Sequence, residues 1–148
     1  MAHDKNLMEI LTNIIHEPTQ YEEEDNLAYV TVNRIGTLTG RGALDFGGSE
    51  YQSAEVEWIE PAKKSEDDTY GWWSLKPGTY RVEFNEGVDL PDDTGVLLQI
   101  WNSVLRNGVT HPTEVITKAR DQLSTHIHVG DPGIEIKENA RLSVVRAL

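Results

Sequence analysis

Three histidines in the last third of the chain are the residues whose type and spacing first suggest chemistry. His126 and His128 alternate with Ile127, so on a β-strand both imidazoles would lie on the same face. With His111 they could form a three-histidine zinc site, since imidazole nitrogen is a preferred zinc ligand. The same alternation describes a polar, solvent-facing row on a strand, which is the interpretation we prefer. We therefore expect no metal ligands in the chain and keep the zinc site as the alternative.

Two other features could hold a nucleotide. The paired Trp72 and Trp73 could stack a nucleobase, but large indoles more commonly bury apolar area, so we expect them in the core. Gly36, Gly40 and Gly42 could bend the backbone around a phosphate, yet their spacing is neither G-x-G-x-x-G before a helix nor a P-loop. We interpret this stretch as a glycine-rich β connection with tight turns or close backbone approach.

Residues 74–108 form the stretch around which the other elements are arranged. A Pro-Gly turn at 77–78 leads into a strand at 79–84, where apolar and polar residues alternate with period two. Further turns frame a short extended piece, and an apolar strand follows at 96–100. This succession of short strands predicts an all-β chain.

The first third of the chain adds a helix and more strands. Apolar residues at three- and four-residue spacing predict a helix from Asp4 to Glu17, which Pro18 should end. Its apolar stripe would pack on the chain's own sheet or, alternatively, on a neighbouring subunit. Alternation predicts strands at 27–32 and 51–59, and the charged segment 61–70 is expected to be a loop.

Two motifs, in this order, resemble the family that joins dUTP diphosphatases (dUTPases) and dCTP deaminases. They are KPGTYRVEFNEGVDLPDDTGVLLQI, with a PG turn, a strand, an LP turn and a strand, and NSVLRNGV, similar to the family's R-S-S-x-x-R-x-G turn. Gly42–Phe46 resembles the early small-x-Asp motif, and Gly133–Val145 resembles the closing hairpin. The resemblance covers most of the chain from about Val30 onward.

The resemblance implies a fold and an assembly. We expect one dUTPase-like domain over 1–148, with the N-terminal helix in 1–17 and a distorted jelly-roll-like β-barrel (a β-clip fold) in 27–148. A single domain also suits a chain of this length. The family further implies a homotrimer with its sites between subunits.

The resemblance also implies a triphosphate-binding turn. Ser103, Arg106, Asn107 and Gly108 match the residues that present hydroxyl, guanidinium and backbone N–H groups to the phosphates. Asn102 replaces the motif's first serine and could still donate a hydrogen bond. Trp101 replaces its first arginine, which removes a phosphate ligand. The alternative for this segment is the start of a buried helix capped by Asn102.

Carboxylates complete the implied site. Asp45 matches the residue that helps to hold Mg²⁺-bound water in dUTPases, although turn formation is an equal alternative for it. Asp121 is the nearest carboxylate to the position that orients the attacking water, with Glu114 as the second candidate. Thr125–His128 stands where the deaminases carry a catalytic Glu. Mg²⁺ would be held mainly by the substrate's phosphates.

Composition limits the partners. The formal net charge is −12, from 25 acidic and 13 basic residues, which opposes nucleic-acid binding. The acidity could alternatively be an adaptation to a salt-rich cytoplasm. The chain has no cysteine and no apolar run near the roughly 18–20 residues of a membrane span, and it opens with no signal-peptide pattern. We expect a cytoplasmic protein.

Three functions follow from these features. The first is a dUTPase-type pyrophosphatase that hydrolyses dUTP with Mg²⁺, using Asp45 and Asp121 for metal and water and Ser103 and Arg106 for phosphate. The second is a catalytically degenerate trimer that binds nucleotide or has a structural or regulatory role, as Trp101 suggests. The third is a dCTP deaminase, which the missing strand Glu argues against.

Overall fold

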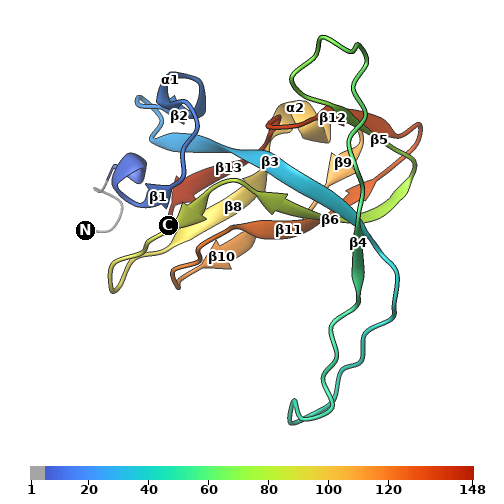
Figure 1. Ribbon diagram of the computed structural model, residues 1–148. Coiled ribbons are helices and arrows are strands. Elements are labelled where there is room, and N and C mark those ends of the chain that lie inside the picture. Colours follow the sequence, from blue (N-terminus) through green and yellow to red (C-terminus); the bar gives the residue numbers. More distant parts are fainter. Residues whose placement is uncertain (1–5) are drawn as a thin grey trace.

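Short antiparallel strands dominate the computed structural model, which describes residues 6–148 (Figure 1). The helices are a 3₁₀ turn, η2 (Leu7–Glu9), and the one-turn helices α1 (Glu17–Gln20) and α2 (Asn102–Leu105). The strands are β1 (Leu11–Thr12), β2 (Tyr21–Glu22), β3 (Leu27–Leu38), β4 (Val56–Trp58), β5 (Trp72–Leu75), β6 (Gly78–Phe84), β7 (Gly87–Val88), β8 (Val96–Ile100), β9 (Val109–Thr110), β10 (Glu114–Ile116), β11 (Ser124–Val129), β12 (Ile134–Lys137) and β13 (Arg141–Ala147).

One large sheet curls so that its two ends meet. Its strand order is β10-β8-β13-β3-β6-β11-β9, with β2 and β4 paired to β3. The terminal strands β9 and β10 are consecutive in the chain, and only residues 111–113 separate them. The sheet is therefore a half-barrel with a seam, which is crossed by the chain itself. This architecture confirms the predicted all-β, distorted jelly-roll-like class.

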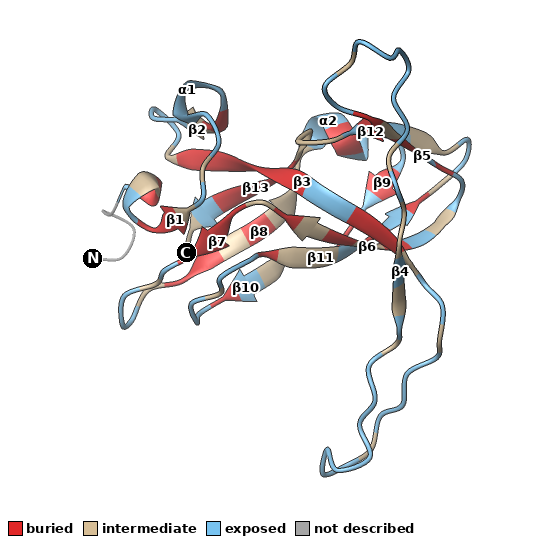
Figure 2. Cartoon of the chain, in the orientation of Figure 1, coloured by how far each residue is buried: buried red, intermediate tan, exposed pale blue. Residues whose placement is uncertain are grey.

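The core fills the inside of this curled sheet (Figure 2). On β6, Tyr80, Val82 and Phe84 are buried as their alternation predicts. Trp73 is also in the core, and its indole N–H donates to the carbonyl of Ile59 at 2.7 Å. Large apolar side chains thus hold the sheet together, as hydrophobic burial requires.

The second tryptophan has a surface role. Trp72 is half-buried, and the ammonium of Lys64 lies 3.9 Å from its ring centroid, with that of Lys137 at 5.6 Å. Cation–π contacts of this kind hold the loop before β5 against the sheet. Neither tryptophan is therefore arranged as a platform for a nucleobase.

The N-terminal helix predicted from Asp4 to Glu17 is wrong over the residues described, and Asp4 lies outside them. The segment instead forms η2 and then β1, which pairs with β7. Asn13 adopts a left-handed backbone conformation with φ 61°, which ends any helix there. Pro18 lies in the first turn of α1, a position that suits proline, so it begins a helix rather than ending one.

A long excursion, which we call the arm (residues 39–55), leaves the sheet between β3 and β4 (Figure 1). Its tip exposes three large apolar side chains: Leu44, Phe46 and Tyr51. The strand predicted at 51–59 is confined to Val56–Trp58. A Cβ at Gly42 would lie 2.6 Å from the carbonyl of Gln52, so this glycine permits the close backbone approach expected from the sequence.

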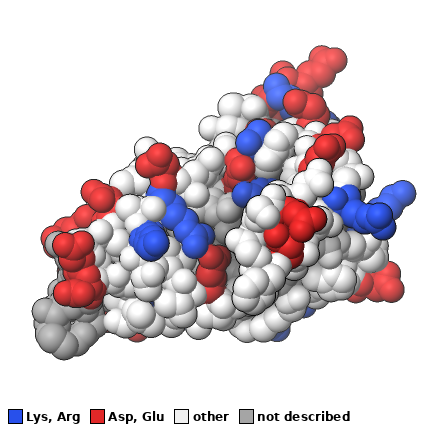
Figure 3. Space-filling model, turned by 90° about the horizontal axis from the view of Figure 1, so that it is seen from below, with Lys and Arg blue, Asp and Glu red and all other residues white. Residues whose placement is uncertain are grey.

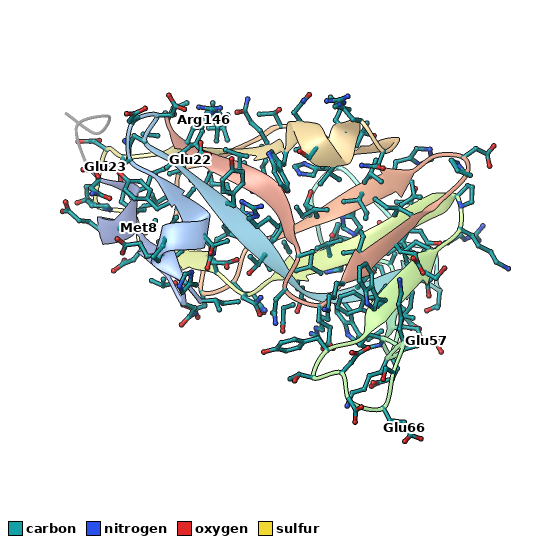
Figure 4. The ribbon with its side chains drawn as sticks, turned by 90° about the horizontal axis from the view of Figure 1, so that it is seen from above. Met8, Glu22, Glu23, Glu57, Glu66 and Arg146 are labelled. Atoms are coloured by element: carbon teal, nitrogen blue, oxygen red, sulfur yellow. The ribbon has the colours of Figure 1, made fainter. Side chains whose placement is uncertain are left out.

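Charged side chains of both signs lie on the surface (Figure 3). Acidic Glu22 and Glu23 lie at one end of the molecule and Glu57 and Glu66 at the other (Figure 4). The face seen from below carries Lys and Arg interspersed with Asp and Glu (Figure 3). Within residues 6–148, no helix has the length and apolar character needed to cross a membrane.

Candidate functional site

A pocket of about 370 Å³ opens at the seam, where the two ends of the sheet meet. One wall is formed by residues 112–114, which lead into β10, and the other by residues 124–126 at the start of β11. Arg81 from β6 and Arg120 from the β10–β11 connection complete the lining. The pocket exists because β10 pairs with β8 while β11 pairs with β6, so the two strands separate.

The wall formed by β11 has a free backbone edge. Leu123 uses its N–H and its carbonyl on the β6 side, bonding Glu86 and Phe84. Because successive residues of an antiparallel strand direct these groups to opposite sides, those of Ser124 and His126 point toward the seam. In the described chain β9 covers this edge only at His128 and Val129. The pocket therefore offers backbone donors and acceptors side by side to a flat polar ring.

The side chains that line the pocket include two arginines, which only donate hydrogen bonds, and several groups that both donate and accept. A nitrogen of Arg81, Nη2, lies 3.3 Å from Oγ of Ser124, and Arg81 stands directly across from His126 in the strand register. Glu114 is paired with Arg120 at 2.8 Å. Partial burial, with a smaller contribution from Arg81, lowers the pKa of His126, so this imidazole is neutral at pH 7.

His111 anchors the crossing from β9 to β10. Its Nε2 lies 2.7 Å from Oγ of buried Ser143, and its Nδ1 lies 2.8 Å from the carbonyl oxygen of Pro112. A carbonyl only accepts, so Nδ1 carries the proton and Ser143 donates to Nε2. Burial lowers the pKa of His111, which keeps the ring neutral and preserves both bonds.

The structure separates the three histidines. His111 is inside the half-barrel, whereas His126 and His128 are exposed on the outer face of β11. No group of three His, Asp or Glu residues in the described chain is placed to hold a metal ion. The solvent-facing row predicted for His126 and His128 is confirmed, and His111 does not lie on their face of the sheet.

The predicted phosphate turn is one exposed structural unit. Asn102 is the first residue of α2, after Trp101 at the N-cap position, so Asn102 is not the cap. Asn107 donates from Nδ2 to the carbonyl of Ser103 at 2.7 Å, which ties the turn together. Gly108 adopts φ +81°, a conformation that favours glycine, and the chain then enters β9. Arg106 lies on the same turn as the C-cap of α2.

Trp101, at the position of the family's first arginine, packs back onto the sheet. Its ring meets that of Tyr29 edge-on, with centroids 5.0 Å apart, and the guanidinium of Arg141 lies 4.6 Å from its centroid. The indole therefore packs on β3 and β13, and it carries no charge with which to bind a phosphate.

The two predicted carboxylates lie away from this turn. Asp45, on the arm, accepts from the N–H groups of Gly48 at 3.0 Å and Glu50 at 2.9 Å, which is turn chemistry. Asp121 is exposed in the β10–β11 connection and is not among the residues that line the pocket, whereas Glu114 is. One chain thus brings Asn102–Gly108 together but leaves the arm, α2 and the β10–β11 connection at separate corners (Figure 1).

Sequence reasoning missed Arg81, Ser124 and the role of His111. The sequence indicated only that Arg81 is on the outward face of a strand, because it alternates with the apolar residues of β6. Ser124 and His111 had none, because their roles depend on how the ends of the sheet meet.

Comparison with known proteins decides the family. No protein-family model matches the chain. A probable deoxyuridine 5'-triphosphate nucleotidohydrolase of Methanosarcina mazei is 32% identical over 135 residues, covering 90% of this chain and 74% of the relative. The chain belongs to the superfamily of dUTPases and dCTP deaminases.

Two further likenesses agree with this membership. A probable deoxyuridine 5'-triphosphate nucleotidohydrolase of Methanococcoides burtonii is 31% identical over 136 residues, covering 90% of this chain and 75% of the relative. The crystal structure of a 2'-deoxycytidine 5'-triphosphate deaminase from Agrobacterium tumefaciens superposes with a TM-score of 0.56 at 14% identity. The superposition covers 82% of this chain and 38% of that chain, and it shows the shared superfamily fold.

Proposed function

We propose that this superfamily member is a dUTPase-type pyrophosphatase, which hydrolyses dUTP to dUMP and pyrophosphate. The observation that carries the proposal is the free backbone edge of β11 in the seam pocket. The N–H and C=O groups of Ser124 and His126 can pair with the edge of a pyrimidine much as a neighbouring strand would. The relatives named as probable dUTP hydrolases support the same activity.

We propose that the complete site forms between copies of the chain, as a homotrimer. The seam pocket and the phosphate turn belong to different parts of one chain, and we propose that one nucleotide uses the pocket of one copy and the turn of another. The arm supports assembly, because Phe46 and Leu44 are almost fully exposed at its tip. Docking of the arm on a second copy would bury these side chains.

In this assembly the phosphate turn of one copy binds the triphosphate. Arg106 supplies a guanidinium, and Ser103 and Asn102 supply polar side chains from the exposed α2. A carboxylate near the pocket then orients a water molecule toward the α-phosphorus and takes its proton. The bond from the α-phosphorus to the oxygen that bridges the α- and β-phosphates breaks. The products are dUMP and pyrophosphate. Asp121 is our predicted base, and Glu114 is the carboxylate that lines the pocket.

Mg²⁺ fits the residues present only as a substrate-bound ion. The described chain has no three-ligand cluster, and Mg²⁺ commonly binds through substrate phosphates with one or two carboxylates. Asp45 on the exposed arm is the carboxylate we propose for that role. The ion would neutralise charge on the phosphates. We also propose that residues 1–148 act as one domain, in the cytoplasm, without nucleic-acid or membrane partners.

A second candidate is a degenerate nucleotide-binding trimer, which the packing of Trp101 favours. Pyrophosphate release from dUTP, dCTP and dTTP, each with Mg²⁺, separates the candidates. We expect release from dUTP, with a loss of at least about 100-fold in Glu114→Gln or Asp121→Asn, whichever residue is the base. Glu135→Gln, an exposed carboxylate on β12, is the matched control. Nucleotide binding with no release would establish the second candidate instead.

A further inference from the structure

Arg81 lines the seam pocket from β6, a strand that does not belong to either of the two pocket walls, residues 112–114 and 124–126. Its guanidinium lies 3.3 Å from Oγ of Ser124 on the neighbouring strand β11. His126 is its cross-strand partner, so the two side chains share the outer face of the sheet. Both side chains line the seam pocket, and both can donate hydrogen bonds to a ligand there.

The contacts of Arg81 leave donor capacity unused. Guanidinium has five N–H donors and no acceptor. Its Nε lies 4.0 Å from Oε2 of Glu83, which is too far for a hydrogen bond, whereas Arg34 binds Oε1 of the same carboxylate at 2.7 Å. Ser124 accounts for one further contact. Arg81 can therefore donate to a ligand in the pocket.

Among the described residues that line the pocket, only Arg81 and Arg120 have side chains that donate hydrogen bonds without accepting any. Among the residues that line it in the described chain, Glu114 is the only carboxylate, and Arg120 binds it at 2.8 Å. The backbone edge of β11 does not favour donors over acceptors, since Ser124 and His126 each offer one N–H donor and one C=O acceptor. Arg81 is thus the donor-only side chain of the lining that is not paired with a carboxylate of the pocket, and it favours a ligand group that accepts.

We propose that Arg81, with His126, recognises the 4-oxo group of a pyrimidine and rejects a 4-amino group. The inference rests on the proposed function. It assigns the recognition of uracil to two side chains, Arg81 and His126, that are not among the site residues predicted from the sequence. Uracil presents an acceptor at position 4, whereas cytosine presents an N–H₂ donor there. A donor facing Arg81 would leave two donors opposed and unpaired, which costs roughly 10- to 100-fold in affinity.

The test compares dUMP and dCMP binding by calorimetry, without Mg²⁺ and without turnover. The wild type should bind dUMP roughly 10- to 100-fold more tightly than dCMP. Arg81→Gln, which offers both a donor and an acceptor, should reduce this ratio to within about threefold, and His126→Glu should reduce it or reverse it. Arg81→Lys keeps the donors and should retain the preference, which separates recognition from a loss of folding. His128→Gln is the matched control, on the same face of β11 but outside the pocket lining.

The outcomes are distinct. Equal affinity for the two nucleotides, no binding of either, or an unchanged ratio in Arg81→Gln would overturn the inference. Selective dUMP binding by a chain that releases no pyrophosphate from dUTP would support the inference and refute only the proposed hydrolysis.

Discussion

The imidazole of His111 and the hydroxyl of Ser143 lie 2.7 Å apart inside the half-barrel. This contact joins residues 111–113, which cross from β9 to β10 between the two ends of the sheet, to the interior strand β13. Because Nδ1 of the same ring donates to Pro112, the imidazole fixes where the chain turns from β9 into β10. The walls of the seam pocket therefore depend on a hydrogen bond in the core.

Ser143→Ala should destabilise the protein by about 1–3 kcal/mol. The substitution leaves Nε2 of His111 buried without its donor, and an unsatisfied buried group costs roughly that amount. Urea unfolding followed by tryptophan fluorescence measures the change. Ser103→Ala, on the exposed α2, is the matched control and should change stability by less than about 0.5 kcal/mol. Equal effects of the two substitutions would contradict the anchoring role of His111.

Stability should fall as the pH drops below about 6.5, the ordinary pKa of histidine. Burial lowers the pKa of His111 in the folded chain, so the unfolded chain binds the proton first. The contribution of neutral His111 to the free energy of unfolding is fully present above pH 6.5. It is lost as the pH falls toward the pKa of His111 in the folded chain, and the free energy of unfolding then changes by at most about 1.4 kcal/mol per pH unit.

Urea unfolding between pH 7.5 and 5.5 measures that slope, and His111→Gln supplies the control. The difference between the two proteins isolates His111, because burial raises the pKa of Glu86 and this gives a contribution of opposite sign. A slope that is the same in both proteins would show that His111 is not the titrating group.

Local patterns predicted the parts of the fold that depend on local chemistry. The alternation at 79–84 gave the buried and exposed faces of β6 correctly, because one side of that strand packs in the core. The apolar spacing near the N-terminus failed, since a 3₁₀ turn and a short strand bury Leu7, Ile10 and Leu11 as well as a helix would. The competing signal was Asn13, whose left-handed conformation breaks the helix.

The seam pocket could not be predicted from the sequence. Arg81 and His126 are far apart in the chain and meet only through the pairing of β6 with β11. The free edge of Ser124 depends in turn on β10 pairing with β8 rather than with β11. The phosphate turn is contiguous in sequence, and for that reason the motif placed Asn102–Gly108 on one structural unit.

Glu86→Gln should cost about 1–3 kcal/mol of stability. The buried carboxylate accepts from the backbone N–H of Thr31 at 2.7 Å, from its hydroxyl at 2.6 Å and from Nε2 of Gln20 at 2.8 Å. An amide would place its N–H₂ against at least one of these donors. Thermal unfolding measures the loss, with Glu135→Gln as the control, because its exposed pair with Lys64 contributes less than about 1 kcal/mol. Equal melting temperatures for the two variants would contradict this role.

Phe46→Ser should weaken self-association without unfolding the chain. The Phe46 side chain is fully exposed in one copy, so its removal costs no core packing, but it would lose its burial in the proposed trimer. Light scattering after gel filtration should show the wild type as a trimer and the variant shifted toward monomer at micromolar concentrations. Tyr70→Ser, an exposed aromatic outside the arm, should leave the trimer intact. A monomeric wild type would contradict the proposed assembly.

Trp101→Arg should increase nucleotide affinity at the expense of stability. The substitution removes the edge-on contact with Tyr29, worth about 0.5–1.5 kcal/mol beyond buried area, and places a second guanidinium near Arg141. In return it restores a charged donor beside the turn, and one hydrogen bond to a charged group contributes about 1.5–3 kcal/mol, or at least tenfold in affinity.

Calorimetry with a non-hydrolysable dUTP analogue and thermal unfolding measure the two effects of Trp101→Arg separately. Trp101→Leu is the control, because it loses the same ring contact without gaining a charge. If the phosphates bind at Asn102–Gly108, only the arginine variant gains affinity while both variants lose stability. If neither variant changes affinity, the phosphates bind elsewhere, and Trp101 is then solely a packing residue of β3 and β13.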